Sequence, residues 1–367
     1  MTEKQDIPSL TGLRGIAAMA VMIYHAAFHI YGPAPTASGL SLMPYRGYLA
    51  VDLFFMLSGF VLAHVYGCQF ATGLRGYGRF IWARFARIYP VHFFVLCLML
   101  PFLGTGEMFS PRSLAFNLVL LQGPWLSTET WNAPSWSISA EWHAYLIFPL
   151  LALALSRARP FGIVLLSTLC VGLLLQLARA NAGDLQPVIH GPFSLARSLP
   201  EFTIGVLAYR CYQSGYCLRL FRSDLTFVVI GAGILALCGI ASSDFVIIAL
   251  LPALLFAASV NAGRVRSVLN GRAIGFLGEI SYALYMVHYF CIVGVIGAVR
   301  WFGGTPSGVA VFTTSLCVSV GLATLASRCI EYPARALLRN IPPVRLITAE
   351  NYGTRRLQSG TYRRSSD

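Results

Sequence analysis

Long apolar stretches follow one another along almost the whole chain, separated by short polar connections. A helix needs about 20 residues to cross the hydrocarbon core of a bilayer. We therefore predict an all-α fold, a polytopic bundle of about ten membrane-crossing helices. The predicted crossings lie near residues 12–31, 48–66, 81–103, 137–156, 161–178, 196–213, 225–241, 245–261, 278–300 and 308–337.

One further apolar stretch, residues 112–123, is too short to cross. If it crossed, the arginine-rich loops would fall on both sides of the membrane. If it is re-entrant or interfacial, all of these loops fall on one side, and positive charge marks the cytoplasmic side. We therefore predict that both termini are cytoplasmic and that residues 104–136 lie outside. The loops predicted to be cytoplasmic are 67–80, 157–160, 210–224 and 262–277.

The composition agrees with a membrane protein, since 56% of the residues are hydrophobic and only 11% are charged. The net charge of +13 comes almost wholly from arginine, and topology explains it without a nucleic-acid partner. We predict a membrane-embedded domain over residues 1–340 and a basic, disordered cytoplasmic tail over 341–367, which would lie against anionic membrane lipids.

The cysteines do not suggest a metal site or a disulfide framework. The chain has nine, mostly in apolar segments, and they show no CxxC or other metal-ligand spacing. We interpret them as small core residues and predict no metal.

The first apolar segment carries Arg14 and His25, which a helix would place on one face. Their separation is about three helical turns, or roughly 16 Å along the axis. Ionisable groups in a membrane helix usually face a protein interior or a water-filled cavity. The pair is therefore interpreted as an anion-binding end and a catalytic end of one site. An arginine at headgroup level beside a structural histidine is the alternative.

A ligand that contacts both Arg14 and His25 must be long, with its anionic end at the cytoplasm. Coenzyme A has these properties, because its phosphates suit arginine and its pantetheine arm is thin and extended. An imidazole is also the commonest general base. The pattern thus favours a coenzyme A thioester as donor and His25 as the base.

A second cluster of basic residues, Arg84 and Arg87, lies near the start of the third predicted crossing. Residues three apart share one helix face, and the free N–H groups of a nearby helix N-terminus would also favour anions. We predict that both arginines bind the phosphates of coenzyme A together with Arg14. Ordinary topology anchors would give the same composition.

Two carboxylates lie at a depth similar to that of His25, namely Asp52 in the second predicted crossing and Glu141 in the fourth. Either one could hold the tautomer of His25 and stabilise its imidazolium, as the orienting partner of a base does. We therefore predict both as catalytic residues. A helix cap for Asp52 and a buried structural hydrogen bond for Glu141 are the alternatives. Gly59 shares a face with Asp52, which would let a neighbouring backbone come close.

Five motifs together resemble one family. Arg14 to His25 is an R-x(10)-H motif and Arg84-Phe-Ala-Arg87 is an RxxR motif. The other three motifs are Gly47-Tyr-Leu-Ala-Val-Asp52 through Phe60, Trp136-Ser-Ile-Ser139-Ala-Glu141-Trp142 and Ile280-Ser-Tyr-Ala-Leu-Tyr-Met-Val-His288. With all five motifs in this order across residues 8–338, the sequence resembles the acyltransferase-3 family of bacterial membrane O-acyltransferases.

This resemblance implies transfer of an acyl group, most often acetyl, from acyl-CoA to a hydroxyl of a surface or secreted carbohydrate at the bacterial inner membrane. Some members carry a C-terminal SGNH-type hydrolase domain. Only about 30 residues follow the last predicted crossing here, so we expect the membrane domain to serve the acceptor itself or to pass the acyl group to another protein. His288 matches a family position and is equally compatible with a structural role.

The rival hypothesis is a transporter or flippase for a polar or lipid-linked saccharide. Intramembrane His, Asp and Glu side chains would then form a proton relay. The sequence has no evident repeats and lacks the paired, interrupted helices typical of such folds. Neither hypothesis specifies the acceptor or the oligomeric state.

Overall fold

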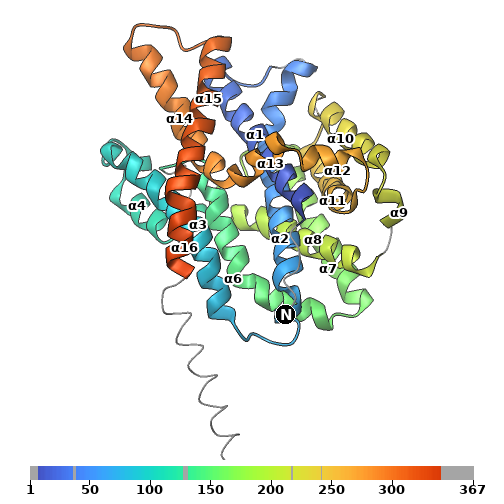
Figure 1. Cartoon of the computed structure of the whole chain (residues 1–367). Coiled ribbons are helices and arrows are strands. Elements are labelled where there is room, and N and C mark those ends of the chain that lie inside the picture. The colour runs from blue at the N-terminus through green and yellow to red at the C-terminus, as the bar shows by residue number, and fades with distance from the viewer. Residues whose placement is uncertain (1–6, 36–38, 127–130, 216–217, 241, 340–367) are drawn as a thin grey trace, which may run out of the picture.

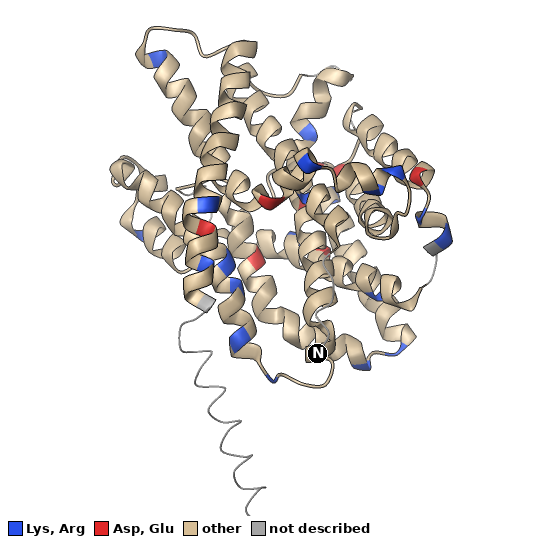
Figure 2. Cartoon of the chain, viewed as in Figure 1, with Lys and Arg blue, Asp and Glu red and all other residues tan. Residues whose placement is uncertain are grey.

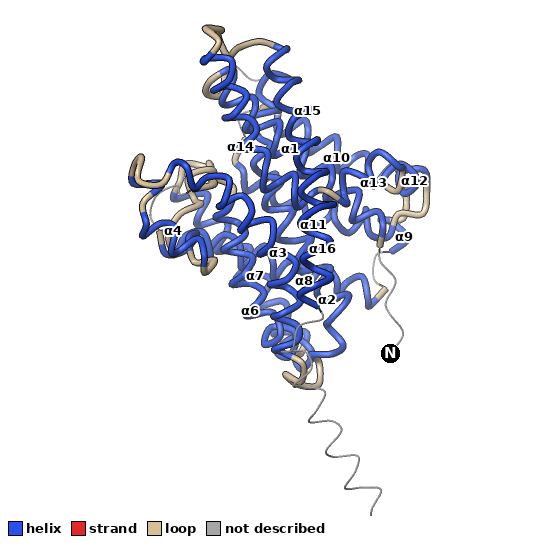
Figure 3. The backbone as a smooth tube through the Cα atoms, turned by 60° about the vertical axis from the view of Figure 1, so that its left-hand side comes forward, coloured by secondary structure: helices blue, strands red, loops and turns tan. Residues whose placement is uncertain are grey.

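The computed structural model describes residues 7–35, 39–126, 131–215, 218–240 and 242–339, and within these it is helical, without strands (Figures 1 and 3). The predicted tail from residue 341 lies outside the described residues. Among the described residues, seven stretches are long and apolar enough to cross a membrane. They are α1 (Pro8–Tyr31), η1 with α2 (Leu40–Leu49, Ala50–Phe70), α3 with η2 (Tyr77–Met99, Leu100–Phe102), α6 (Ser135–Arg157), α7 (Pro160–Ala180), α14 (Ser281–Trp301), and α15, η4 and α16 (Val309–Ala326, Ser327–Glu331, Tyr332–Arg339), which span Val309–Leu338.

The three other predicted crossings are also helices, but they differ from these seven. Helix α8 (Pro192–Ser214) has 23 residues and contains Arg197, Glu201 and Arg210. Helices α10 (Asp224–Cys238) and α11 (Asp244–Val260) have 15 and 17 residues. At 1.5 Å per residue they extend only about 22 and 26 Å, against a hydrocarbon core of about 30 Å. The all-α membrane bundle is confirmed, while the count of ten and the cytoplasmic termini stay predictions.

The short apolar stretch near residues 112–123 forms two helices, α4 (Pro111–Leu118) and α5 (Gln122–Trp125). Leu120, between them, has a φ of 59°, a left-handed conformation that breaks the helix. Eight and four residues are too short to cross, as the sequence indicated. The remaining short helices are η3 (Glu107–Phe109), α9 (Leu218–Phe221), α12 (Arg264–Leu269) and α13 (Arg272–Glu279).

Glycines bring helix α2 and helix α8 into direct backbone contact. A Cβ added at Gly59 would lie 2.0 Å from the carbonyl oxygen of Phe202. A Cβ at Gly205 would lie equally close, 2.0 Å, to the carbonyl oxygen of Met56. The close approach expected at Gly59 is confirmed, and the backbone it admits is that of α8.

The ends of the bundle differ in charge. The α14–α15 connection lies at the upper end in Figure 1, and the α2–α3 connection lies at the lower end. Arginines are frequent at the lower and right-hand parts of the molecule in Figure 2 and sparse where α14 joins α15. This asymmetry is the pattern that positive charge on the cytoplasmic side would produce.

Candidate active site

A cavity of about 1220 Å³ lies among α1, α2, α3, α6, α13, α14, η4 and α16. Along α2 its lining runs from Val51 to Gln69, a length of about 27 Å at 1.5 Å per residue. We call it the inner cavity. Its charged lining residues are Arg14, Arg84, Arg87, Arg335, Glu141, Glu279 and Glu331. The three arginines predicted to bind the donor therefore come from two helices into one space.

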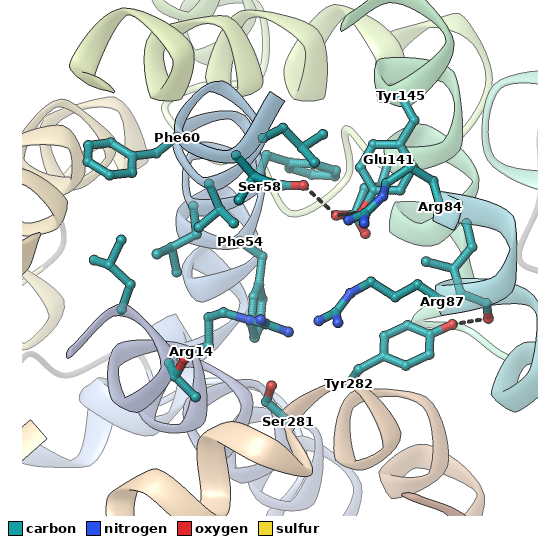
Figure 4. A pocket seen from close by; sticks show the side chains of 18 of the residues that line it. Arg14, Phe54, Ser58, Phe60, Arg84, Arg87, Glu141, Tyr145, Ser281 and Tyr282 are labelled. Atoms are coloured by element: carbon teal, nitrogen blue, oxygen red, sulfur yellow. Dashed lines mark hydrogen bonds between the residues drawn. The ribbon is translucent and has the colours of Figure 1, made fainter. Parts of the chain in front are cut away.

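Arg14 and Arg87 direct their guanidinium groups toward each other across the inner cavity (Figure 4). Within the described part of the chain, no hydrogen bond or salt bridge involves either guanidinium. Two half-buried cations that face one space repel each other unless an anion lies between them. The space between Arg14 and Arg87 is therefore suited to an anionic group such as a phosphate.

Arg84 also lines the cavity, but it has protein partners. Its Nη2 donates a hydrogen bond to the hydroxyl of Tyr66 at 3.1 Å, and its guanidinium lies 5.3 Å from the centre of the Tyr66 ring. One element of the prediction for Arg84 and Arg87 is wrong. Helix α3 begins at Tyr77, so both residues lie beyond the first four N–H groups and gain nothing from a helix N-terminus.

Glu141 lies in the same cavity and accepts two short hydrogen bonds. Ser58 Oγ donates to its Oε1 at 2.6 Å and the Tyr145 hydroxyl donates to the same oxygen at 2.5 Å (Figure 4). Ser137, one turn earlier on α6, is 2.7 Å from the hydroxyl of Tyr285 on α14. The polar face of α6 thus lines the inner cavity, and Tyr285 marks the part of the cavity next to α14.

His25 and His288 form a pair across the interface of α1 and α14. His288 Nε2 is 3.1 Å from His25 Nδ1, and the ring centroids are 5.0 Å apart. His288 is fully buried, and its ring centroid is 5.9 Å from that of Tyr285. Arg14 and Tyr285 both line the inner cavity, and Tyr285 lies beside His288, so this tyrosine connects the cavity to the histidine pair, although neither histidine lines the cavity itself.

The hydrogen bonds of the pair determine its tautomers. His25 Nδ1 is 3.0 Å from the carbonyl oxygen of Val21, and His288 Nδ1 is 3.1 Å from that of Leu284. A carbonyl only accepts, so in the neutral rings each Nδ1 carries the proton. The single proton on His25 Nδ1 is then shared between the Val21 carbonyl oxygen and His288 Nε2, and His25 Nε2 keeps its lone pair. Nε2 is the nitrogen of His25 that can take a proton from a substrate.

The predicted orienting carboxylates do not occupy this position. Asp52 accepts two hydrogen bonds from Arg197 of α8, at 2.8 Å from Nε to Oδ1 and 2.8 Å from Nη2 to Oδ2. Both side chains are buried. Glu141 bonds to Ser58 and Tyr145, as described above. The side chain within hydrogen-bonding distance of the His25 ring is therefore His288, and the role predicted for Asp52 and Glu141 toward His25 has no support in these contacts.

Two residues of this region escaped the sequence analysis, Arg197 and Glu201. Glu201 Oε1 lies 3.8 Å from Arg197 Nε, one helical turn along α8. A charged i,i+4 pair inside an apolar segment was the available signal, because such residues in membrane helices are rare and functional. His288 was visible in the sequence, but only the structure shows that it contacts His25.

The structure also bears on metal binding. Within the described residues, no three His, Cys, Asp or Glu side chains are grouped closely enough to hold a metal ion. Eight of the nine cysteines lie in the described part, and all eight are free thiols. Cys217 lies outside it.

Comparison with known proteins gives the same family as the sequence motifs. The family model described as an acyltransferase domain, acyltransferase 3, matches residues 7–328. The chain is 29% identical over 381 residues to acyltransferase MdmB of Streptomyces mycarofaciens, covering 92% of this chain and 94% of that protein. It is 24% identical over 383 residues to O-acetyltransferase OatA of Staphylococcus aureus strain NCTC 8325, covering 91% of this chain and 58% of OatA.

Another relative, protein 2 in the picA locus of Rhizobium radiobacter, is 38% identical over 151 residues, which are 37% of this chain and 74% of that protein. No solved structure matches the chain. The family match covers Arg14, Arg84 and Arg87 of the inner cavity and the histidine pair. The chain therefore belongs to the acyltransferase-3 family, as a multi-pass membrane member.

Proposed function

We propose that the chain transfers an acyl group, most often acetyl, from cytoplasmic acyl-CoA to a hydroxyl of an extracytoplasmic or lipid-linked carbohydrate. The observation that carries the proposal is the inner cavity, which Arg14 and Arg87 line without a hydrogen-bond or salt-bridge partner in the described part of the chain, and which reaches Tyr285 beside His288. Arg14 and Arg87 bind the phosphates of the donor, and Arg84 supports them. The location that fits this reaction is the bacterial inner membrane.

In the proposed reaction the thioester of the donor lies near Tyr285, beside His288 and His25. His25 Nε2 removes the proton of the acceptor hydroxyl, and the oxygen attacks the thioester carbonyl. The new C–O bond forms as the C–S bond breaks. The coenzyme A thiolate leaves and takes the proton from the His25 imidazolium. His288 holds the His25 ring in the required tautomer throughout.

The names of the relatives support acyl transfer as the class of reaction, without specifying the donor or the acceptor. OatA is named an O-acetyltransferase and MdmB an acyltransferase. Donor and acceptor are inferences from the charge and shape of the cavity. Consumption of acetyl-CoA by the purified chain would separate this function from that of a saccharide transporter, which moves its substrate without consuming a thioester.

The test is the substitution His25→Ala in the purified full chain, with acetyl-CoA as donor. Removal of a general base lowers the rate by about 10²–10⁴-fold, so we expect transfer to fall by this factor while coenzyme A binding is kept. His143→Ala is the matched control, because His143 Nδ1 lies 2.7 Å from the carbonyl oxygen of Ser139, one turn earlier on its own helix, and His143 lines neither of the two spaces beside the histidine pair. Turnover near that of the unmodified chain in His25→Ala would remove His25 from the chemistry.

A further inference from the structure

A second, smaller pocket is lined by Tyr24, the residue that precedes His25 on α1. Its volume is about 460 Å³, and it lies between the last turns of α1, the 3-10 helix η1 and two connections, residues 181–191 before α8 and the segment before α11. We call it the outer pocket. The side chains that matter for its chemistry are Tyr24, Arg46, Tyr48, Asp184 and Gln186.

Neither histidine lines the inner cavity or the outer pocket, but each space has one lining tyrosine beside the histidine pair. Tyr285 lines the inner cavity and lies 5.9 Å, between ring centroids, from His288. Tyr24 lines the outer pocket, and its ring centroid is 4.7 Å from that of His25. A reaction that joins a donor and an acceptor at His25 needs two binding spaces, and this arrangement provides them.

The charge of the outer pocket differs from that of the inner cavity. Arg46 forms a salt bridge with the buried Asp244 and is therefore neutralised by the protein itself. Asp184 is exposed and accepts a hydrogen bond from the backbone N–H of Gln186 at 2.8 Å. Its Oδ1 also lies 3.3 Å from the Tyr48 hydroxyl, which donates to Asp244 Oδ2 at 2.7 Å. A carboxylate at the surface and a paired arginine do not favour a second anionic ligand. They leave hydrogen-bonding groups for an uncharged one.

The side chains of the pocket suit a sugar ring. Carboxylate and amide groups hydrogen-bond to hydroxyls, and tyrosine rings supply apolar faces with polar edges. Gln186 Nε2 donates to the Tyr24 hydroxyl at 3.3 Å, which connects the exposed loop to the ring beside His25. Pockets that bind small polar molecules combine a largely apolar wall with a few placed polar groups in this way.

Buried charges hold the loop that carries Asp184 and Gln186. Arg197 Nη1 donates to the carbonyl oxygen of Leu185 at 2.7 Å, and the Leu185 amide donates to Asp244 Oδ2 at 2.7 Å. Arg197 is itself fixed by the two hydrogen bonds to Asp52. Both backbone groups of Leu185 are therefore tied to buried side chains, and the loop is held in place before any ligand binds.

We propose that the outer pocket is the acceptor site and that it takes a carbohydrate ring, with Asp184 and Gln186 as its hydrogen-bond partners. The proposal rests on the proposed function, because it assigns the acceptor of that reaction to a place. Asp52 then acts as a positioning residue, which holds the loop through Arg197.

The test measures binding of a panel of methyl pyranosides to the purified full chain, loaded with coenzyme A, by saturation-transfer NMR. We expect binding to the unmodified chain, weakened about tenfold or more in Asp184→Asn, since a hydrogen bond to a charged group is lost. Gln186→Ala should weaken it less. Both residues are exposed, so the fold is kept. Glu107→Gln, an exposed carboxylate outside the pocket, is the matched control and should bind normally.

This measurement does not depend on turnover, so its failure differs from failure of the proposed function. Pyranoside binding that is absent, or equal in Asp184→Asn and the unmodified chain, would overturn the acceptor site even if acetyl-CoA is consumed. Binding that depends on Asp184 in a chain that never consumes acetyl-CoA would support the site and contradict the transferase. Coenzyme A affinity should be the same in all variants, and a parallel loss of that affinity would also overturn the assignment.

Discussion

Arginines occupy two kinds of environment in this protein. Arg197 is 1% exposed and makes hydrogen bonds to Asp52 and to the Leu185 carbonyl. Arg14 and Arg87 are half-buried, face the inner cavity and have no hydrogen-bond or salt-bridge partner in the described part of the chain. The same side chain is thus a completed structural group in one place and an unsatisfied charge in the other.

The difference shows how a membrane protein separates stability from binding. A buried charge must be paired within the protein, and breaking such a pair is costly. A charge that faces a cavity can stay unpaired until a ligand binds, and the ligand then supplies the missing hydrogen bonds. Substitutions should therefore lower stability at Arg197 and donor affinity at Arg14 and Arg87.

The largest effect is expected for Arg197→Ala. The change leaves Asp52 buried without its partner, which costs about 3–5 kcal/mol of unfolding free energy. The measurement is the free energy of unfolding in mixed micelles titrated with sodium dodecyl sulfate. Arg112→Ala on α4, an exposed arginine, is the control, with an expected loss below about 0.5 kcal/mol. Equal losses in the two variants would show that the pair with Asp52 contributes no more than a surface residue.

The next effect is expected for Arg87→Ala and Arg14→Ala. Each removes a charge-assisted contact to a phosphate, worth roughly 1.5–3 kcal/mol, so the dissociation constant of coenzyme A should rise about 10- to 100-fold. Unfolding free energy should change little, because no protein partner is lost. Isothermal titration with coenzyme A measures the first quantity and the detergent titration the second. If the affinity is unchanged in both variants, the inner cavity is not the phosphate site.

Lysine substitutions should have smaller effects than alanine substitutions, and they test the difference between the cavity-facing arginines and Arg197 more closely. Arg87→Lys keeps the charge but loses the planar fork, so donor affinity should fall by less than about tenfold. Arg197→Lys should rescue stability poorly, because one ammonium group cannot reproduce two parallel bonds to Asp52 and a third to Leu185. Full rescue by lysine at both positions would mean that only charge matters, and the distinction between the two environments would be lost.

The sequence predicted the helical class, the shared face of Arg14 and His25, and the close approach at Gly59, because each of these follows from helix periodicity within one segment. It also placed Arg14, Arg84 and Arg87 in one group, through motifs in fixed order. The periodicity of one helix does not predict its contacts with helices that lie far away in the sequence. Asp52 and Arg197 are separated by 145 positions, and His25 and His288 by 263.

For this reason the sequence alone did not identify the side chain that lies within hydrogen-bonding distance of His25. A carboxylate is the usual orienting group for a catalytic histidine, and both Asp52 and Glu141 had suitable depth. Every helix that crosses the membrane has residues at the depth of His25, so depth alone does not show which of them contacts His25. The structure selects His288, which lies on α14 directly across from α1.

Arg84 provides the smallest and most discriminating effect, because it combines both environments. It lines the inner cavity and also bonds to Tyr66, with aromatic contacts to Tyr66 and Phe80. Arg84→Ala should therefore lower the unfolding free energy by about 1 kcal/mol, through the lost hydrogen bond and cation–π contacts, and weaken coenzyme A by less than about tenfold. Tyr66→Phe removes the hydroxyl alone and should reproduce part of the stability loss without changing donor affinity. Arg84→Ala could instead weaken coenzyme A binding as much as Arg87→Ala does. Arg84 would then leave Tyr66 when the donor binds. In that case a hydrogen bond to a protein group would not distinguish structural arginines from arginines that bind the ligand.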